Sequence, residues 1–398
     1  MAIYNNAAKF HADAYDVVVV GAGYSGLVFA RKYLEYNPQK RIAIIEKRPQ
    51  IGGNAHDFID DSGVLVHLFG PHIFHTHMKE VYDFLSQFTE WLDYEHRVLA
   101  NVHGTLLPVP FNKTSLEIAF GQEKARELYA ALVEEFGKDT KVPISKLRSS
   151  NNEKLKEVAD YIYENIFLHY TMKQWDKKPE EIDSAVTARV PIYISEDDRY
   201  FQDAYQGMPK EGYTKMFERM LDHPNIDVYL NTEFLSLASI EKTSIYFGDK
   251  KYDGLIIYSG AVDELFSCDF GALPYRSIDM RFEQLNMKSF QPQATVNYTT
   301  SEDFTRITEF KKMTGQEDLE TTTILKEYPQ AYKPGEGIDP YYPINNEENQ
   351  ALYEKYRSRA NLITNFYVLG RLGEYRYYDM DDTTKAALDL ARKLSNEE

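Results

Sequence analysis

A glycine-rich turn between two apolar runs constrains the fold of this 398-residue chain more than any other feature. The apolar run from Asp16 to Val20 leads directly into the turn, which reads Gly21-Ala22-Gly23-Tyr24-Ser25-Gly26. A helix-compatible segment from Leu27 to Tyr36 follows, and a second apolar run then ends at Glu46. Strand, glycine turn, helix, strand and acid in this order predict a dinucleotide-binding βαβ unit.

Each glycine of the turn has a physical role in such a unit. Gly21 is expected to make the tight turn, Gly23 lets the backbone approach a pyrophosphate, and Gly26 lets the helix pack closely on the strand. The N-terminus of the helix offers free N–H groups and a partial positive charge to the phosphates. Glu46 follows at the distance where an acid can accept a hydrogen bond from a ribose hydroxyl. Glycine also marks ordinary turns, so the flanking strands and the acid carry much of this prediction.

The spacing of the unit does not distinguish FAD from NAD. The residues Glu46-Lys47-Arg48, followed by Gly52-Gly53-Asn54, resemble flavoproteins, in which a second glycine pair approaches FAD. This resemblance favours FAD as the cofactor.

Composition excludes several classes of partner. The net charge of −17 argues against nucleic acid and anionic membranes as bulk partners, although a local basic pocket remains compatible with it. Cys268 is the only cysteine, which excludes internal disulfides and fits a reducing cytoplasm. No apolar run approaches the ~18 residues that cross a bilayer, so no membrane insertion is expected. Met1 to Ala14 lacks the apolar core of a signal peptide and is expected to be a mostly disordered leader.

The densest histidine cluster comprises His72, His75 and His77. No motif of acidic or further histidine ligands accompanies it, so no metal site is predicted. A purely structural role, with the rings hydrogen-bonded in a loop, stays open at this point.

The rest of the chain predicts an α/β protein whose Rossmann-like FAD-binding domain is split in sequence by an inserted helical bundle and an antiparallel β-sheet domain. Residues 115–175 show apolar residues at helical spacing, with a polar break at 146–154, and residues 275–328 read as alternating β segments. The expected division is 1–92 (FAD-binding domain, first part), 93–112 (hairpin of the sheet domain), 113–188 (helical bundle), 189–217 (mobile loop and sheet segment), 218–265 (FAD-binding domain, second part), 266–360 (antiparallel substrate domain) and 361–398 (FAD-binding domain, last part).

Five motifs occur together and in order, and they carry a family resemblance. They are Gly52 to Ala55, Gly70 to Thr76, Tyr170 to Trp175, Gly212 to Lys215 and Gly370 to Met380. In this combination the chain, from about Tyr15 to Leu394, resembles the bacterial UDP-galactopyranose mutases. The last motif is the most specific of the five.

The resemblance implies a three-domain, homodimeric, cytoplasmic FAD enzyme that interconverts UDP-galactopyranose and UDP-galactofuranose for cell-surface polysaccharide. In that family the flavin must be reduced, although the reaction has no net redox change. Its N5 atom displaces UDP from the anomeric carbon and forms a flavin–sugar adduct, and the sugar ring then opens and recloses with a different size. The absence of GxSxG and HExxH motifs agrees with a nucleophile supplied by the cofactor.

The resemblance also assigns residues to the substrate. It implies that Arg306 binds the diphosphate, because departing UDP develops negative charge, and that three phenols donate to it. The implied substrate residues are Tyr170 and Asn297 for the uridine, Trp175 beside the sugar, and Tyr200, Tyr342 and Tyr377 for the diphosphate. Arg189 and Tyr193 are also predicted to bind the substrate. Arg306, His75 and Tyr377 are the predicted catalytic residues. Without the resemblance, each tyrosine would more often be a core or surface aromatic, and Trp175 could equally cap the bundle core.

The remaining assignments concern the flavin. The resemblance implies that His72 and His75 lie at the flavin, Arg371 near its pyrophosphate or ring, and Asp379 at its ribityl end. Tyr378 and Met380 belong to the same motif. Together with Gly21, Gly23, Tyr24, Ser25, Gly26, Glu46, Lys47, Arg48, Gly53 and Asn54, these residues form the predicted cofactor site.

One stretch departs from the family pattern. Relatives usually show two arginines, the second on a mobile loop that contacts the diphosphate, where this chain has Arg189-Val190-Pro191-Ile192-Tyr193. Losing a charge-assisted phosphate contact would remove about 1.5–3 kcal/mol of stabilisation. The open explanations are that Arg199 or another loop residue compensates, that the substrate is another nucleotide sugar, or that the chain is a weakly active paralogue. A smaller departure is Asp303-Phe304, where Pro-Tyr is common.

Three alternatives to a UDP-galactopyranose mutase remain open. The first keeps the flavin chemistry but acts on another nucleotide sugar, for instance a dTDP-linked deoxysugar. The second is an FAD amine oxidase or desaturase, which shares the glycine unit and the split topology. The third is a catalytically inactive binding module, which explains the complete motif from Gly370 to Met380 poorly.

Overall fold

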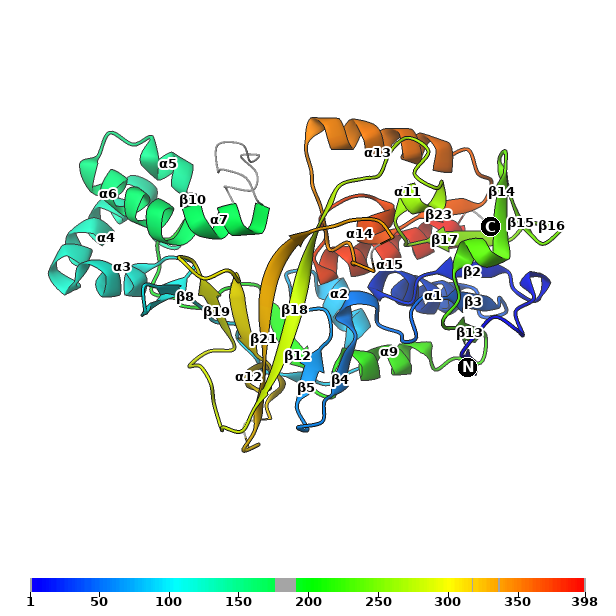
Figure 1. Ribbon diagram of the computed structural model, residues 1–398, viewed down its shortest axis with the longest axis horizontal. Helices are drawn as coiled ribbons and strands as arrows, with labels where there is room; N and C mark the ends of the chain where they lie inside the picture. Colours follow the sequence, from blue (N-terminus) through cyan, green and yellow to red (C-terminus); the bar gives the residue numbers. More distant parts are fainter. Residues whose placement is uncertain (1, 176–190, 317, 336, 397–398) are drawn as a thin grey trace.

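The computed structural model describes residues 2–175, 191–316, 318–335 and 337–396. Figure 1 shows three parts arranged along the long axis: a helical bundle at one end, a sheet of long strands in the middle, and a parallel sheet covered by helices at the other end. Both ends of the chain lie in the part that holds the parallel sheet.

The parallel sheet has the order β1-β13-β3-β2-β17-β23 among its described strands, and each neighbouring pair is parallel. The strands are β1 (Ala2–Tyr4), β2 (Val17–Val20), β3 (Ile42–Ile45), β13 (Ile226–Tyr229), β17 (Leu255–Tyr258) and β23 (Phe366–Val368). Every residue of β2, β3 and β13 is buried, as expected for parallel strands that are covered on both faces. The sheet is drawn from segments far apart in the sequence, so the predicted split Rossmann-like fold is confirmed.

Alternate side chains of β2 enter two different cores. Val17 and Val19 pack in a core with α1 (Tyr24–Tyr36), α9 (Tyr213–Leu221) and α15 (Met380–Asn396). Val18 and Val20 pack on the opposite face with α11 (Val262–Leu265), α13 (Glu347–Ala360) and a small meander. The meander consists of β14 (Ala238–Glu241), β15 (Ser244–Phe247) and β16 (Lys250–Tyr252).

The close packing of α1 on the sheet depends on Gly26, as expected from the sequence. A Cβ atom at this position would lie 2.1 Å from the carbonyl oxygen of Gly21 and 2.9 Å from a methyl group of Val19. No larger residue fits there without moving the helix away from β2.

The predicted disordered leader is wrong. Ala2 to Tyr4 forms β1, which extends the parallel sheet by pairing with Asp227 to Tyr229. The Tyr4 ring stacks on the Tyr229 ring with centroids 4.9 Å apart. The polar composition of the segment concealed a short edge strand that needs only one apolar face.

The central sheet has the order β22-β18-β21-β20-β19-β8-β9 over the described strands. These are β8 (Val98–Val102), β9 (Thr105–Val109), β18 (Tyr275–Leu285), β19 (Thr295–Tyr298), β20 (Arg306–Glu309), β21 (Thr322–Ala331) and β22 (Tyr342–Pro343). The β segments expected between 275 and 328 are confirmed as antiparallel neighbours. The 98–109 hairpin joins this sheet through a parallel pairing of β8 with β19.

The helical bundle contains the periodic apolar residues that predicted it, among them Leu128, Leu132, Val158 and Ile162, all buried in one core. Its described helices are α3 (Lys113–Phe120), α4 (Gln122–Phe136), α5 (Ile144–Arg148), α6 (Glu153–Ile162), a π-helical turn (Tyr163–Phe167) and α7 (Leu168–Trp175). The expected break at 146–154 is confirmed in part, because residues 149–152 separate α5 from α6, but α5 occupies its first residues. The chain also leaves the helical pattern at β10 (Lys141–Pro143), which pairs with β11 (Pro191–Tyr193).

Short elements connect the three parts. The strands are β4 (Asp57–Ile59), β5 (Leu65–His67), β6 (Phe74–Thr76), β7 (Trp91–Leu92) and β12 (Tyr205–Pro209), and the helices are α2 (Lys79–Leu85), α10 (Phe234–Leu237), α12 (Lys311–Thr314) and α14 (Gly370–Gly373), with 3-10 turns at Ala12–Ala14 and Gly53–Ala55. Antiparallel pairing of β6 with β12 places His75 opposite Gln206. None of the helices in the described ranges has the length and apolar character needed to cross a membrane.

Candidate functional site

Two cavities meet between the parallel sheet and the central sheet. The glycine-turn cavity includes the turn after β2, the end of β3 and the Gly52-Gly53-Asn54 segment. The tyrosine cavity is lined by His72, Ile73, His75, His96, Val98, Tyr200, Phe201, Thr295, Asn297, Arg306, Tyr342, Arg371, Tyr377, Asp379 and Met380. His72, Arg371, Asp379 and Met380 line both, so the cavities share one wall.

Backbone forms much of the glycine-turn cavity. A Cβ atom on Gly53 would lie 2.8 Å from the Cα atom of Gly23, so the two glycine segments touch. Gly370, from the last motif, lies so close to Ser25 that a Cβ atom there would be 2.2 Å from the serine oxygen. Gly23 is also the N-cap of α1 and has no side chain to accept from the first N–H groups of the helix. The cavity thus offers backbone donors and the positive end of a helix dipole to an anion.

Glu46 is positioned by two backbone groups at the edge of this cavity. Its carboxylate accepts hydrogen bonds from the Ala22 N–H at 2.7 Å and the Arg48 N–H at 2.8 Å, and the residue is 6% exposed. Arg48 is fixed as well, because it donates to Asn54 at 3.0 Å and pairs with Asp339 at 2.7 Å. The acid and the guanidinium are therefore held before any ligand arrives.

Most predicted cofactor residues line the glycine-turn cavity. They are Gly21, Gly23, Tyr24, Ser25, Glu46, Lys47, Arg48, Gly53, Asn54, His72, Arg371, Asp379 and Met380. The ring of Tyr24 packs instead against Phe217, at 4.9 Å between centroids, and burial raises the pKa of its hydroxyl well above the usual value. Tyr24 therefore offers its backbone to a ligand.

Gly26 and Tyr378 are predicted cofactor residues that line neither cavity. Gly26 acts through helix packing, as described above. Tyr378 acts through its backbone, because its carbonyl oxygen accepts a hydrogen bond from Arg371 at 2.5 Å. Both remain predicted cofactor-site residues, with indirect roles in this structure.

Arg371, in the shared wall, contacts two tyrosines of the tyrosine cavity. Besides Tyr378, its guanidinium donates to the carbonyl oxygen of Tyr341 at 3.2 Å. The rings of Tyr342 and Tyr377 lie 5.2 and 5.5 Å from its carbon and are stacked on each other at 6.0 Å. One cation thus positions two phenols that come from separate segments.

Arg306 and its neighbours supply the polar character of the tyrosine cavity. Arg306 faces Glu327 across the β20–β21 register, with Nε 3.3 Å from a carboxylate oxygen. Burial raises the pKa of Glu327, and the charge of Arg306 opposes this shift. Thr295 and Asn297, on one face of β19, each have a buried side-chain oxygen without a hydrogen-bond partner among the described residues. Unsatisfied polar atoms at a cavity wall fit a polar ligand.

The three histidines that line the tyrosine cavity differ in exposure: His96 is buried, whereas His72 and His75 are partly exposed. Burial lowers the pKa of His72 to about 3, and its Nδ1 donates to the Gly70 carbonyl oxygen at 2.8 Å. Burial likewise lowers the pKa of His96 to about 3, and Tyr94 contacts its Nδ1 at 2.9 Å. His75 stacks on Phe201 with centroids 3.6 Å apart, and its Nδ1 lies 3.3 Å from an oxygen of Asp203.

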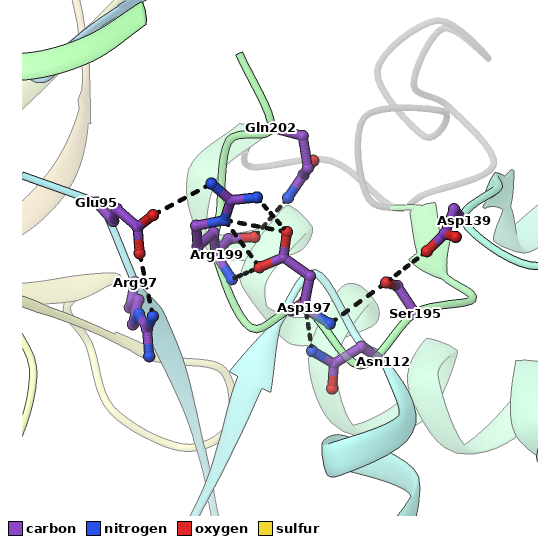
Figure 2. Close-up of polar contacts among 8 residues, drawn as sticks. All are labelled: Glu95, Arg97, Asn112, Asp139, Ser195, Asp197, Arg199 and Gln202. Carbon is purple, nitrogen blue, oxygen red and sulfur yellow. Dashed lines mark hydrogen bonds and ion pairs between the residues drawn. The ribbon is translucent and has the colours of Figure 1, made fainter. Parts of the chain in front are cut away.

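The segment before β12 is held by a polar network, which Figure 2 shows. Asp197 pairs with Arg199 at 2.8 Å, and Arg199 reaches Glu95 at 3.2 Å. Asn112, at the start of α3, donates to the Asp197 carbonyl oxygen at 3.1 Å. The next residues, Tyr200 and Phe201, enter the tyrosine cavity. Arg199 itself lines neither cavity, so the structure does not support it as the compensating cation.

Tyr193 is placed differently from the prediction. It is 8% exposed in β11, pairs with Lys141 of β10 and lines neither cavity. The argument that its presence removes a diphosphate contact is therefore not supported by its position. Arg189 lies outside the described residues. Tyr170 and Trp175 lie in α7, and the structure does not describe their side chains.

The structure also adds residues that the sequence did not single out. His96, Phe201 and Thr295 line the tyrosine cavity, and Asp203 and Glu327 contact its predicted residues. Phe201 could have been predicted because it follows Tyr200 in the sequence. Glu327 could be found only from the strand register that places it opposite Arg306. In the described part of the chain, no group of three or more His, Cys, Asp or Glu residues is placed to hold a metal ion.

Comparisons with known sequences identify proteins that this chain resembles. The model of the UDP-galactopyranose mutase family matches residues 165–377, and that of an NAD(P)-binding Rossmann-like domain matches residues 19–88. The UDP-galactopyranose mutase of Mycoplasma genitalium is 34% identical, with 98% of both chains covered. A probable UDP-galactopyranose mutase of Klebsiella pneumoniae is 37% identical over 94% of both chains. The dTDP-fucopyranose mutase of Escherichia coli is 33% identical over 94% of this chain and 97% of its own.

Solved structures confirm the fold. A reduced UDP-galactopyranose mutase superposes with a TM-score of 0.66 at 14% identity, covering 96% of this chain and 94% of its own. A putrescine oxidase variant superposes with a TM-score of 0.55 at 12% identity, covering 96% and 98%. Because a mutase and an oxidase share the fold, the fold alone does not select the reaction.

Proposed function

The chain belongs to the UDP-galactopyranose mutase family, and from this premise we propose that it interconverts UDP-galactopyranose and UDP-galactofuranose with reduced FAD as its cofactor. One observation carries the proposal. Arg306, Tyr200, Tyr342, Tyr377 and Asn297 come from separate segments and line one cavity, and that cavity shares a wall with the glycine-turn cavity. A nucleotide sugar in one cavity would thus contact a dinucleotide in the other.

The glycine-turn cavity fits FAD. The N–H groups at the start of α1 would hold the pyrophosphate, and Glu46 would accept from a ribose hydroxyl with lone pairs that its two backbone donors leave free. Lys47 and Arg48 lie beside it in the lining. When bound and reduced, the flavin would supply the nucleophile for the anomeric carbon.

The residues of the tyrosine cavity would bind and orient the nucleotide sugar. Arg306 would neutralise the diphosphate, which gains negative charge as its bond to the sugar breaks. Tyr200, Tyr342 and Tyr377 would donate their hydroxyl protons to it, and Asn297 would accept from the uracil base. Arg371, which lines both cavities, would hold the stacked rings of Tyr342 and Tyr377 in place. Tyr170, Trp175 and Arg189 remain predicted members of this site.

Three further expectations rest on the family alone. We propose that the enzyme is a homodimer, that it acts in the cytoplasm, and that it supplies galactofuranose to cell-surface polysaccharide. Light scattering of the purified protein tests the first of these.

An anaerobic turnover assay tests the proposed reaction. The purified protein is reduced with dithionite and given UDP-galactofuranose, and the products are separated by anion-exchange chromatography beside an unreduced control. We expect UDP-galactopyranose of unchanged mass in the reduced sample only. Oxidation of the sugar would instead support the amine-oxidase class, and tight binding of reduced cofactor and substrate without conversion would support the binding module.

A second candidate substrate is a dTDP-linked deoxysugar, because the Escherichia coli relative is named a dTDP-fucopyranose mutase. Tyr193 does not add support for this candidate, because it lines neither cavity. Comparing kcat/KM for UDP-galactofuranose and dTDP-fucofuranose under the same reducing conditions decides between them. The deoxysugar candidate fails if the UDP sugar is turned over at least tenfold better.

A further inference from the structure

A carboxylate contacts His75, a partly exposed histidine of the tyrosine cavity. Nδ1 of His75 lies 3.3 Å from one oxygen of Asp203, and Nε2 of His77 lies 3.4 Å from the other. His75 lies in β6 and His77 follows directly after the end of this strand. Asp203 lies two residues before β12, the strand that pairs with β6, and contacts both rings. The carboxylate thus lies between two imidazoles, one in the cavity and one at the surface.

The two imidazoles differ in exposure. The side chain of His77 is 70% exposed, whereas those of His75 and Asp203 are each 17% exposed. Nδ1 of His77 accepts from the backbone N–H of Ala204 at 3.4 Å, which leaves its Nε2 proton to face Asp203. His77 therefore supports the carboxylate from the solvent side and lies outside the cavity lining.

Asp203 is the acidic group that faces Nδ1 of His75. Burial would raise the pKa of the Asp203 carboxyl, but the contact with His75 and the charges of both histidines bring it below the usual value. An ionised carboxylate only accepts, so a hydrogen bond between the two would be donated by Nδ1 of His75 and would leave Nε2 for exchange. At 3.3 Å the two groups are in contact, but Nδ1 has no hydrogen-bond partner among the residues that the structure describes. Phe201 fixes the plane of the same ring by stacking at an interplanar angle of 16°.

A change of sugar ring size needs a group of this kind. In the pyranose the anomeric carbon C1 is bonded to O5, and in the furanose it is bonded to O4. When C1–O5 breaks, O5 gains a proton, and when C1–O4 forms, O4 loses one. The protons balance without an oxidant or reductant, so one residue that gives a proton and then recovers it is sufficient.

We propose that His75 is this residue and that Asp203 positions it, an inference that rests on the proposed mutase function. His75 gives its Nε2 proton to O5 as the pyranose opens and recovers a proton from O4 as the furanose closes. In the reverse direction the two oxygens exchange roles. The Nδ1 proton stays toward Asp203 throughout, and the carboxylate stabilises the imidazolium form.

The variant Asp203→Asn tests this directly, because it keeps the size of the side chain and removes the charge. We expect kcat to fall about 100-fold, within the range of acid–base contributions, while KM and the Kd of UDP stay within about twofold. The control His77→Gln removes the other imidazole on the same carboxylate and should keep kcat within about threefold. Asp203→Glu, which restores the charge, should recover part of the loss.

A second measurement tests the contact between His75 and Asp203 without turnover. Nitrogen-15 NMR of histidine-labelled protein reports which imidazole nitrogen carries the proton. We expect a protonated Nδ1 for His75 in the wild-type protein and a shift of that proton in Asp203→Asn, with an unchanged melting temperature. The proposed role of Asp203 is wrong if the wild type is active and the Asp203→Asn variant keeps its kcat. It is also wrong if the variant changes only KM. A wild type inactive on every nucleotide sugar overturns the proposed function instead.

Discussion

The glycine-turn cavity and the tyrosine cavity share a wall but are built in different ways. Much of the first comes from one stretch of chain, in which Gly21 to Gly26 and Glu46 are fixed by local backbone geometry. The second is assembled from β8, β19, β20, the segment before β12 and the last motif. A site of the first kind tolerates little change in its backbone, whereas a site of the second kind depends on individual side chains and on strand register. Substitutions should therefore affect the two cavities differently.

The largest effect is expected at Arg306 in the tyrosine cavity. Removing it alone would leave Glu327 buried without its ion-pair partner, which destabilises proteins by about 3–5 kcal/mol. We therefore compare Arg306→Ala/Glu327→Gln with Glu327→Gln alone. The loss of the cation should lower kcat/KM about 10²–10³-fold while flavin content is unchanged. A double variant within tenfold of its parent would show that Arg306 does not bind the developing charge.

The glycine-turn cavity should lose its cofactor when its backbone is crowded by an added side chain. In Gly53→Ala the new methyl group would lie 2.8 Å from the Cα atom of Gly23, at a residue with φ of +56°. We expect loss of most bound flavin, measured as flavin absorbance relative to protein absorbance. The matched control is Gly63→Ala, which has φ of +82° but no atom within 4 Å of its new methyl group. The control carries the backbone strain of about 1–2 kcal/mol and should keep its flavin.

The same contrast explains what the sequence could predict. Local order along the chain gives the βαβ unit, because glycines, strands and acid lie within one short stretch. The antiparallel segments and bundle helices follow from periodicity. Glu327 could not be predicted, because its partner is set by a pairing between two strands. Asp203 could not be predicted either, because it contacts His75 and His77, which lie more than 120 residues earlier in the chain. The family resemblance named Tyr200 and Tyr193 together, and only the structure separates a cavity tyrosine from one in a strand ladder.

A buried histidine behind the shared wall, His67, adds a pH dependence to stability. His67 is 1% exposed, its Nδ1 accepts from the His72 N–H at 3.0 Å, and burial lowers its pKa to about 3. The unfolded chain binds a proton at this ring below about pH 6.5 and the folded protein does not. The ring therefore leaves stability unchanged above that pH and lowers it as the pH falls toward 3, by about 1.4 kcal/mol per pH unit. His67→Asn, whose amide oxygen can replace Nδ1 as the acceptor, should unfold in urea with a weaker dependence between pH 6.5 and 5. An unchanged dependence would mean that His67 is protonated in the folded protein.

The smallest effect is expected at Tyr193, and it sharpens the contrast because Tyr200 lies in the same segment. Tyr193 is buried in the β10–β11 ladder and lines neither cavity, so Tyr193→Phe should leave KM and kcat within about twofold. Tyr200 lines the tyrosine cavity, and Tyr200→Phe should raise KM about three- to tenfold, the equivalent of one lost hydrogen bond of 0.5–1.5 kcal/mol. Steady-state kinetics of both variants on the reduced enzyme makes the comparison. If Tyr193→Phe instead raised KM as much as Tyr200→Phe, the β10–β11 ladder would have to open during binding and bring Tyr193 to the diphosphate.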